Sequence, residues 1–332
     1  MVLRRVPIEY RPRSVPVHAY VGRMDPSYTQ GVLEPAGSDA CTYESYGSWL
    51  SNWVKGGGLL LLAPGPQLLS THPQSLLHQV SSLALADFSK RSRTHFVAKV
   101  GRSLVGDSHH IPLALERMLA RRTLTYGLRS EPPRTFPANY FRMAPDLAYA
   151  SGFVQEALRS QVDGPYERPT IALSFRQDNL PPVAALKALI NLIYSEGHDP
   201  VFIAQVRSDN SAMATLAHRF GASSLLWSEE GHTSHLQKVL AVYSSSTAIY
   251  TNRLHAAIFA SMAGAAVVSW TSHEDRKIES CLGRYLPNMA VASYEEEAPR
   301  WGQQSSPAVL QDLCTQATAA MTAALLPLQE SE

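Results

Sequence analysis

Residue types that could carry chemistry stand together at Arg253-Leu254-His255, inside the stretch YTNRLHAAIFASMAG. The apolar residues Leu254, Ile258 and Met262 that run through this stretch are spaced as on one face of a helix, which Gly264 would end. Arg253 and His255 therefore fall in the first turn of a predicted helix. Free backbone N–H groups and the helix dipole favour an anion there, and an arginine strengthens that preference.

His255 is the candidate proton donor of this stretch. The helix dipole disfavours a cationic imidazole, but a bound trianion would reverse the effect and leave the ring protonated near neutral pH. We expect Thr251 or Asn252 to cap the helix. An acid beside an anion-binding arginine indicates a reaction centre, and the alternative is a capped helix with two solvated side chains.

Two further cations follow neighbouring predicted strands. Arg176 comes directly after strand 170–175, and its planar fork suits a phosphate or a carboxylate. Lys277 begins a helix beyond strand 266–270. Because the carboxyl ends of parallel strands meet at one edge of a sheet, both side chains are expected near Arg253.

The first half of the chain offers weaker candidates for contacting a ligand. Gly65 and Gln67 lie in the loop expected after strand 59–63, and Arg102 lies in the loop expected after strand 95–100. Arg129 stands at the end of strand 124–126. A turn, a surface position or a capping role is the alternative for each. The more conspicuous Gly56-Gly57-Gly58 precedes its strand, at the edge where ligands do not bind, and is interpreted as a turn.

Short apolar runs alternate with amphipathic stretches in the second half, as in βαβ units around a parallel sheet. The predicted strands are 170–175, 200–204, 224–227, 248–250 and 266–270, and the predicted helices are 182–195, 209–220, 233–243 and 254–263. This alternation indicates a doubly wound domain of Rossmann type. The first half is less regular, with strands expected at 16–21, 59–63, 95–100 and 124–126.

The chain has 332 residues, which favours about two domains. The stretch SQVDGPYERP, 160–169, has the composition of a linker, so we predict Rossmann-like domains over 1–159 and 160–306 with a cleft between them. A helix over 308–325 dominates the remaining segment, 307–332, and is expected to pack back on the first domain.

A formal net charge of +1 gives no electrostatic argument for nucleic acid or a membrane surface as the main partner. The N-terminus lacks the apolar core of a signal peptide, and no apolar run reaches the roughly 20 residues of a membrane helix. The three cysteines are widely spaced and suggest neither disulfides nor a metal site, which indicates a reducing cytoplasm. Residues Glu295 to Glu297 are interpreted as a solvated loop.

The sequence resembles the polysaccharide pyruvyl transferase family. The resemblance is carried first by TNRLHAAIFASMAGAAVVSW, then by IALSFRQD and HEDRKI, and more loosely by VGRSLVG and YGLRSE. It implies two Rossmann-like domains arranged as in GT-B glycosyltransferases. It also implies transfer of pyruvate from phosphoenolpyruvate to two hydroxyls of a sugar, as a cyclic ketal, with release of phosphate.

By this resemblance, Arg253 and the Leu254 amide would hold phosphoenolpyruvate, and His255 would be the general acid. Arg176 and Lys277 would neutralise the phosphate or the carboxylate of the donor. The reaction calls for no cofactor beyond this co-substrate and for no metal. The acceptor would be a sugar or glycan, free or lipid-linked, and in the second case the enzyme would work at the inner face of the membrane. Acceptor recognition is assigned to Gly65, Gln67, Arg102 and Arg129.

Two alternatives stay open at this stage. A nucleotide-sugar glycosyltransferase on the same scaffold would need an acidic residue for the ribose hydroxyls, for which Glu229 and Glu230 are the candidates. A non-catalytic sugar- or anion-binding protein of the same fold would bind ligands without releasing phosphate.

Overall fold

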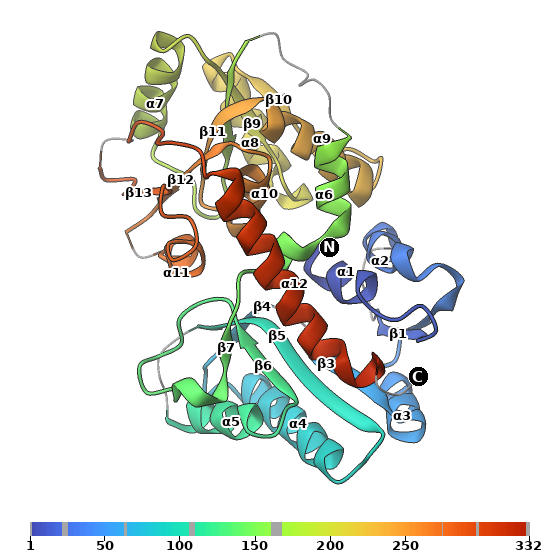
Figure 1. Ribbon diagram of the computed structural model, residues 1–332. Coiled ribbons are helices and arrows are strands. Elements are labelled where there is room, and N and C mark those ends of the chain that lie inside the picture. The colour runs from blue at the N-terminus through green and yellow to red at the C-terminus, as the bar shows by residue number, and fades with distance from the viewer. Residues whose placement is uncertain are drawn as a thin grey trace. The chain divides into compact units, whose positions relative to one another are not determined.

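A computed structural model describes residues 2–21, 26–62, 65–105, 110–160, 168–273, 275–296 and 299–329. Its contacts divide the chain into two compact units. The first comprises Met1–Ser151 with Thr315–Glu332, and the second comprises Gly152–Cys314. Each unit is an α/β fold with parallel strands (Figure 1). Most of the expected linker, residues 161–167, lies outside the described residues.

The second unit contains a six-stranded parallel sheet in the order β10-β9-β8-β11-β12-β13. Its strands are β8 (Thr170–Ser174), β9 (Asp199–Ile203), β10 (Ser223–Leu225), β11 (Ser246–Thr251), β12 (Ala266–Thr271) and β13 (Ala290–Ser293). Numbered along this unit, the order is 3-2-1-4-5-6, which is that of a Rossmann fold. β8 and β12 are buried along their whole length, because helices cover both faces of the sheet.

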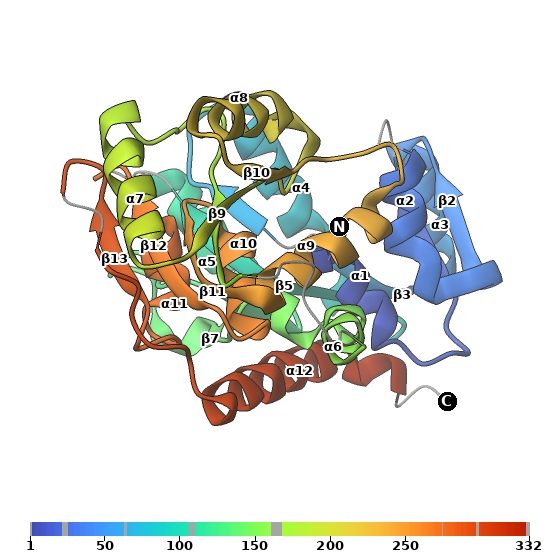
Figure 2. The same ribbon diagram turned by 90° about the horizontal axis from the view of Figure 1, so that it is seen from above.

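Six helices accompany this sheet: α6 (Gly152–Arg159), α7 (Val183–Ser195), α8 (Asn210–Phe220), α9 (His232–Ser245), α10 (Leu254–Met262) and α11 (Lys277–Leu282). Figure 2 shows α7 and α8 on one side of the strands and α9 to α11 on the other. Connections between parallel strands are right-handed, so the helices change from one face of the sheet to the other where the strand order reverses at β8. The core packs leucines of α7 and α8 against β8, and Trp270 of β12 belongs to the same cluster.

The first unit has a smaller parallel sheet in the order β3-β5-β6-β7, with β4 also paired to β5. Its strands are β3 (Gly58–Leu62), β4 (Gly65–Leu68), β5 (His95–Val105), β6 (Thr125–Leu128) and β7 (Arg142–Met143). β3 pairs with the first half of β5 and β4 with the second half. A separate parallel pair is formed by β1 (Val17–Tyr20) and β2 (Ala40–Tyr43).

The helices of the first unit are α1 (Val2–Glu9), α2 (Pro26–Leu33), α3 (Tyr46–Gly56), α4 (Pro73–Lys90) and α5 (His110–Ala120). The last helix, α12 (Pro307–Gln329), contributes its residues from Thr315 onward to this unit. Gly57 ends α3 with φ 76°, and a Cβ atom there would lie 2.7 Å from the Thr94 carbonyl oxygen. The triple glycine is thus the tight turn between α3 and β3.

Two loops expected in the first half are strands in the structure. Residues 65–67 belong to β4, and β5 continues past Val100 to Val105. Gly101 explains the longer strand, because it adopts φ 67° at a register shift between Lys99 and Arg102. Glycine in this left-handed conformation makes a β-bulge, which inserts one residue while the pairing continues on both sides.

The elements predicted between residues 170 and 270 agree with the structure to within about two residues at each end, whereas α12 ends four residues beyond the predicted helix 308–325. The strand β13 is additional, as are β2, β4 and β7 in the first half. The first unit ends at Ser151, so α6 belongs to the second unit, whereas the expected boundary lay after residue 159.

Candidate active site

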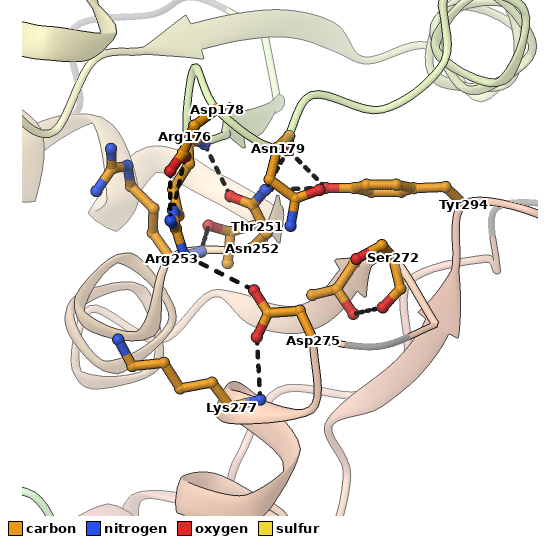
Figure 3. A network of polar contacts seen from close by, with 11 residues as sticks. Arg176, Asp178, Asn179, Thr251, Asn252, Arg253, Ser272, Asp275, Lys277 and Tyr294 are labelled. Carbon is orange, nitrogen blue, oxygen red and sulfur yellow. Dashed lines mark hydrogen bonds and ion pairs between the residues drawn. The ribbon is translucent and has the colours of Figure 1, made fainter. Parts of the chain in front are cut away.

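The candidate site lies at the point of the second sheet where the strand order reverses. β8 and β11 are neighbours there, and the connections from their carboxyl ends run to opposite faces of the sheet. Ligands of open parallel sheets bind in the crevice that this divergence creates. Arg176 follows β8, and Arg253 follows β11 (Figure 3). The strand order therefore brings these two predicted residues to one edge.

Arg253 occupies the N-cap position of α10, with an extended backbone. Its backbone N–H donates to the Thr251 hydroxyl at 2.9 Å, and that hydroxyl donates to the Ser174 carbonyl of β8 at 2.6 Å. The first turn of α10 contains no acidic residue and no side-chain cap. The positive end of the helix dipole therefore coincides with a guanidinium, which is the arrangement expected of an anion site.

The expected caps, Thr251 and Asn252, do not cap α10. Thr251 lies two residues before the N-cap position and ties the strand end to β8 instead. Asn252 is buried, and its side-chain oxygen accepts the Arg176 N–H at 2.8 Å. Its amide group donates to the Asn179 carbonyl at 2.5 Å and to the Tyr294 hydroxyl at 2.9 Å. Asn252 thus locks the loop that carries Arg176 to the start of α10.

Tyr294 closes this network from the end of β13. Its hydroxyl donates to the Asn179 carbonyl at 3.0 Å (Figure 3). Burial raises the pKa of Tyr294, so the phenol keeps its proton throughout the physiological range. The sequence analysis missed both Asn179 and Tyr294, because their contacts join segments that are distant along the chain.

Asp209, at the start of α8, holds the side chain of Arg253. The carboxylate is buried and forms an ion pair with the guanidinium, and its other oxygen accepts the Gln177 N–H at 3.2 Å. The Nε atom of Arg253 is buried and has no hydrogen-bond partner among the described residues. The ion pair holds the guanidinium in place, and a fixed guanidinium is suited to an additional anionic ligand.

Arg176 also has carboxylate partners. Its Nε and Nη2 atoms donate to the two oxygens of Asp178 at 2.9 and 2.6 Å, and its Nη1 atom lies 3.8 Å from Asp275. The hydrogen bonds with Asp178 raise the pKa of Arg176 and lower that of the Asp178 carboxyl. Arg176 is about one-third exposed, so a ligand anion can reach it only by sharing it with these carboxylates or displacing them.

Lys277 is the first residue of α11, and its backbone N–H donates to Asp275 at 3.3 Å. Its side chain is exposed. The three predicted cations of this edge therefore have three acidic neighbours, which the sequence analysis did not identify: Asp178, Asp209 and Asp275.

His255 is the second residue of α10, and its side chain is half-buried. The imidazole lies 6.1 Å from the Phe259 ring, centroid to centroid, with the planes 24° apart. Phe259 is one turn further along the helix and supports the ring on one face. The predicted acid is therefore an oriented side chain in the first turn of α10.

The four residues predicted to recognise the acceptor contact other residues of the first unit in the structure. Gly65 pairs with Arg102 in the sheet, and Gln67 and Arg102 are buried within their strands. Arg129 does follow β6, but its guanidinium is buried, donates to the Ser103 hydroxyl at 3.0 Å and pairs with Asp146. The expectation that Gly65, Gln67 and Arg102 lie on ligand-facing loops is wrong, because the bulge at Gly101 extends the strands through them.

Three other sequence predictions concern a metal site, membrane-spanning helices and the two glutamates, Glu229 and Glu230, that a nucleotide-sugar glycosyltransferase would use to bind ribose. In the ranges that the structure describes, no cluster of three potential metal ligands occurs, and no helix has both the length and the apolar character to cross a bilayer. Glu229 is fully exposed and lies 3.9 Å from Arg207, and Glu230 binds Ser234 and Lys238.

Residues 139–274 match the family described as polysaccharide pyruvyl transferase. The expected resemblance is thereby confirmed over this segment, which contains Arg176 and Arg253-Leu254-His255 and ends three residues before Lys277. Over this segment the chain is similar to that family. No curated protein matches the sequence.

Solved structures resemble the whole chain in fold at low sequence identity. The UDP-GlcNAc 2-epimerase of Neisseria meningitidis, bound to UDP-GlcNAc, matches with a TM-score of 0.53 and 8% identity, over 99% of this chain and 96% of that one. The UDP-GlcNAc 2-epimerase of Methanocaldococcus jannaschii matches with a TM-score of 0.52 and 9% identity, over 96% of this chain and 89% of that one. Alr3699/HepE of Anabaena, in complex with UDP, matches with a TM-score of 0.51 and 13% identity, over 99% of this chain and 90% of that one. The fold is thus of the GT-B type, as predicted.

Proposed function

We propose that this chain transfers pyruvate from phosphoenolpyruvate to two hydroxyls of a sugar in a glycan or glycoconjugate, forming a cyclic ketal and releasing phosphate. The observation that carries the proposal is the position of Arg253 at the N-cap of α10 and of His255 in its first turn, where the connections that follow β8 and β11 diverge. The family match over residues 139–274 supports a transferase of this kind.

The donor is a small trianion, and the residues proposed to hold it are cations and backbone donors. The guanidinium of Arg253 and the Leu254 N–H would bind one anionic group, because both lie at the positive end of α10. Arg176 and Lys277 would balance the remaining charge from the loops after β8 and β12. Asp209 keeps the Arg253 fork in place while the donor binds.

His255 would donate its proton to the methylene carbon of the enol, which makes the neighbouring carbon electrophilic. A sugar hydroxyl then forms a C–O bond to that carbon and loses its proton, which restores the imidazolium. Phosphate leaves with the electron pair of its C–O bond, and the second hydroxyl closes the ring. The proton of the second hydroxyl goes to the phosphate. The sum is one ketal and one phosphate from one donor and one diol, with no redox step.

The ion pairs of Arg176 have a consequence for donor binding. Asp178 occupies the Nε and Nη2 donors that a phosphate or carboxylate would use, and the Asp275 carboxylate lies 3.8 Å from Nη1. Exposed ion pairs contribute only about 0–1 kcal/mol, so a trianion can displace Asp178 at little cost. On binding, the donor would therefore replace the Asp178 carboxylate at Arg176, whose guanidinium fork is already oriented.

Phosphate release from phosphoenolpyruvate tests this function when it is measured across a panel of methyl glycosides with adjacent or 4,6-related hydroxyls. We expect release that depends on the glycoside, and a product heavier than the acceptor by one pyruvate less one water in mass spectrometry. Release without any acceptor, or none across the panel although phosphoenolpyruvate binds, would count against transfer to sugars of this kind.

The nucleotide-sugar alternative is tested in the same assay series. The fold relatives named above were solved with UDP or UDP-GlcNAc, or act on UDP-GlcNAc by name. Here, however, both candidate ribose-binding acids are exposed and have salt-bridge partners: Glu229 lies near Arg207, and Glu230 binds Lys238. We expect thermal stabilisation by phosphoenolpyruvate and not by UDP-sugars.

A further inference from the structure

The first unit contains a cavity of about 1070 Å³ that no part of the proposed reaction uses. It lies at the amino ends of three strands, since Gly58 begins β3, Thr94 precedes β5 and Leu124 precedes β6. The segment before β7 and the last turns of α12 complete its wall. The cavity therefore lies at the edge of the sheet opposite the carboxyl ends of the strands. Arg129, which follows β6, is at the carboxyl-end edge. The volume suffices for an organic ligand of moderate size.

The charge of the cavity wall has one sign. Arg93, Arg121 and Arg142 line it, and none of its lining residues in the described chain is acidic. The next residue along, Arg122, is not part of the wall and pairs with Asp87 at 2.5 Å. Three arginines, with no carboxylate among the described lining residues, favour an anion in the cavity, and guanidinium forks suit phosphate oxygens.

One of the arginines is already oriented. The guanidinium of Arg121 lies over the Tyr140 ring, 4.4 Å from its centroid. Stacking on a ring uses the face of the guanidinium and leaves the N–H donors in its plane available. Arg121 is therefore fixed in one orientation while it can still donate to an anion.

The same wall has an apolar part that faces solvent. Leu124 is 49% exposed and Leu326 is 46% exposed, although both are leucines that would ordinarily be covered. Phe141 lies in the same lining. Covering exposed leucine surface is favourable because it removes apolar area from water. A ligand that fills the cavity would thus gain from an apolar portion as well as from its charge.

We propose that this cavity binds an anionic amphiphile, namely a phosphate ester whose head contacts Arg93, Arg121 and Arg142 and whose apolar chain covers Leu124 and Leu326. The inference concerns the first unit alone and does not depend on the proposed transferase reaction. The proposed ligand belongs to the class of alkyl phosphates, which carry a phosphate head on an apolar chain.

Calorimetric titration with octyl phosphate, below its micelle concentration, tests the proposal. The protein carries Arg253→Ala throughout, so that binding at the candidate active site does not contribute. We expect saturable binding that Arg121→Ala/Arg142→Ala weakens about tenfold or more, as for lost hydrogen bonds to a charged group. Arg134→Ala, an exposed arginine of the same unit outside the cavity, should leave the affinity unchanged.

Two comparison ligands separate the head from the chain. Inorganic phosphate should bind at least tenfold more weakly than octyl phosphate, and octyl glucoside, which has the same chain and no charge, should also bind more weakly. Leu124→Ser should weaken octyl phosphate and not inorganic phosphate. Absence of saturable binding, equal affinity in the double variant, or equal affinity for either comparison ligand would overturn the proposal.

Discussion

At the scale of single residues, the candidate active site is defined by how its cations are held. Arg253 has a buried carboxylate partner in Asp209, and Arg176 has a partly exposed one in Asp178. Burial makes the first pair a fixed part of the fold, whereas solvent weakens the second. The two arginines are therefore expected to respond differently to substitution.

Asp178→Asn should tighten the binding of phosphoenolpyruvate. The substitution removes a negative charge that competes for the Arg176 fork, and Asp178 is too exposed for its loss to affect folding much. We expect KM for phosphoenolpyruvate to fall about threefold to tenfold, the size of one charge at intermediate dielectric. Steady-state phosphate release measures it. Glu196→Gln, which removes the exposed partner of Arg300, is the control and should change nothing.

Arg253→Lys should weaken donor binding although it keeps the charge. Lysine lacks the planar fork that reaches Asp209 and the donor together. We expect the Kd for phosphoenolpyruvate to rise about tenfold, the loss of one charge-assisted hydrogen bond. Calorimetry at constant pH measures it, and an unchanged Kd would show that Arg253 does not bind the donor through its fork.

At the scale of elements, the two halves of the chain differ in how far the sequence predicts them. The strands of the second unit are buried runs separated by amphipathic helices, and both patterns can be identified locally. Arg176 and Arg253 could therefore be placed at strand ends. The carboxylate partner of Arg253 could not, because Asp209 meets Arg253 only through the order of the strands.

The first unit escaped prediction at β4 and β5 because a single glycine changes the strand. Gly101 with its φ of 67° extends β5, and this buries Arg102 where a loop was expected. A charged residue in a predicted loop looks solvent-exposed, and only the pairing geometry shows that it is not.

Gly101→Ala tests the bulge. A side chain in the left-handed region costs about 1–2 kcal/mol, so the free energy of unfolding should fall by that amount. Gly56→Ala is the matched control, because Gly56 lies in α3 with open space around it. That change should leave stability equal or raise it by about 0.5–1 kcal/mol. Urea denaturation of both variants gives the comparison, and equal effects would contradict the bulge.

His235 in α9 should make the second unit sensitive to acid. Its ring is buried against the Ala204 carbonyl, 2.8 Å from Nε2, and burial lowers its pKa below 6.5. The unfolded chain titrates at about 6.5, so it takes up the proton first as the pH falls. Stability is therefore fully present above pH 6.5 and declines as the pH drops through the folded pKa.

The measurement is the free energy of unfolding at pH 7.5 and pH 5.5. His235→Gln should reduce the difference between the two values, whereas His218→Gln, an exposed histidine of α8, should leave it as in the unaltered chain. An unchanged difference in His235→Gln would show that another group is responsible.

At the scale of the whole molecule, the proposed donor chemistry belongs to the second unit. The family match covers residues 139–274, and the fold resembles GT-B proteins along nearly the whole chain. The acceptor residues predicted in the first unit are mostly buried, so the choice of sugar is not assigned to them. The donor site at α10 therefore carries the central claim.

That claim is tested most directly by comparing His255→Gln with the unaltered chain, using phosphoenolpyruvate and an acceptor that supports phosphate release. Removal of a general acid should lower kcat by about 10² to 10⁴. The Kd for phosphoenolpyruvate should stay within about threefold, because Arg253 and the helix start still bind the donor. Phosphate release at the original rate in His255→Gln would contradict the account.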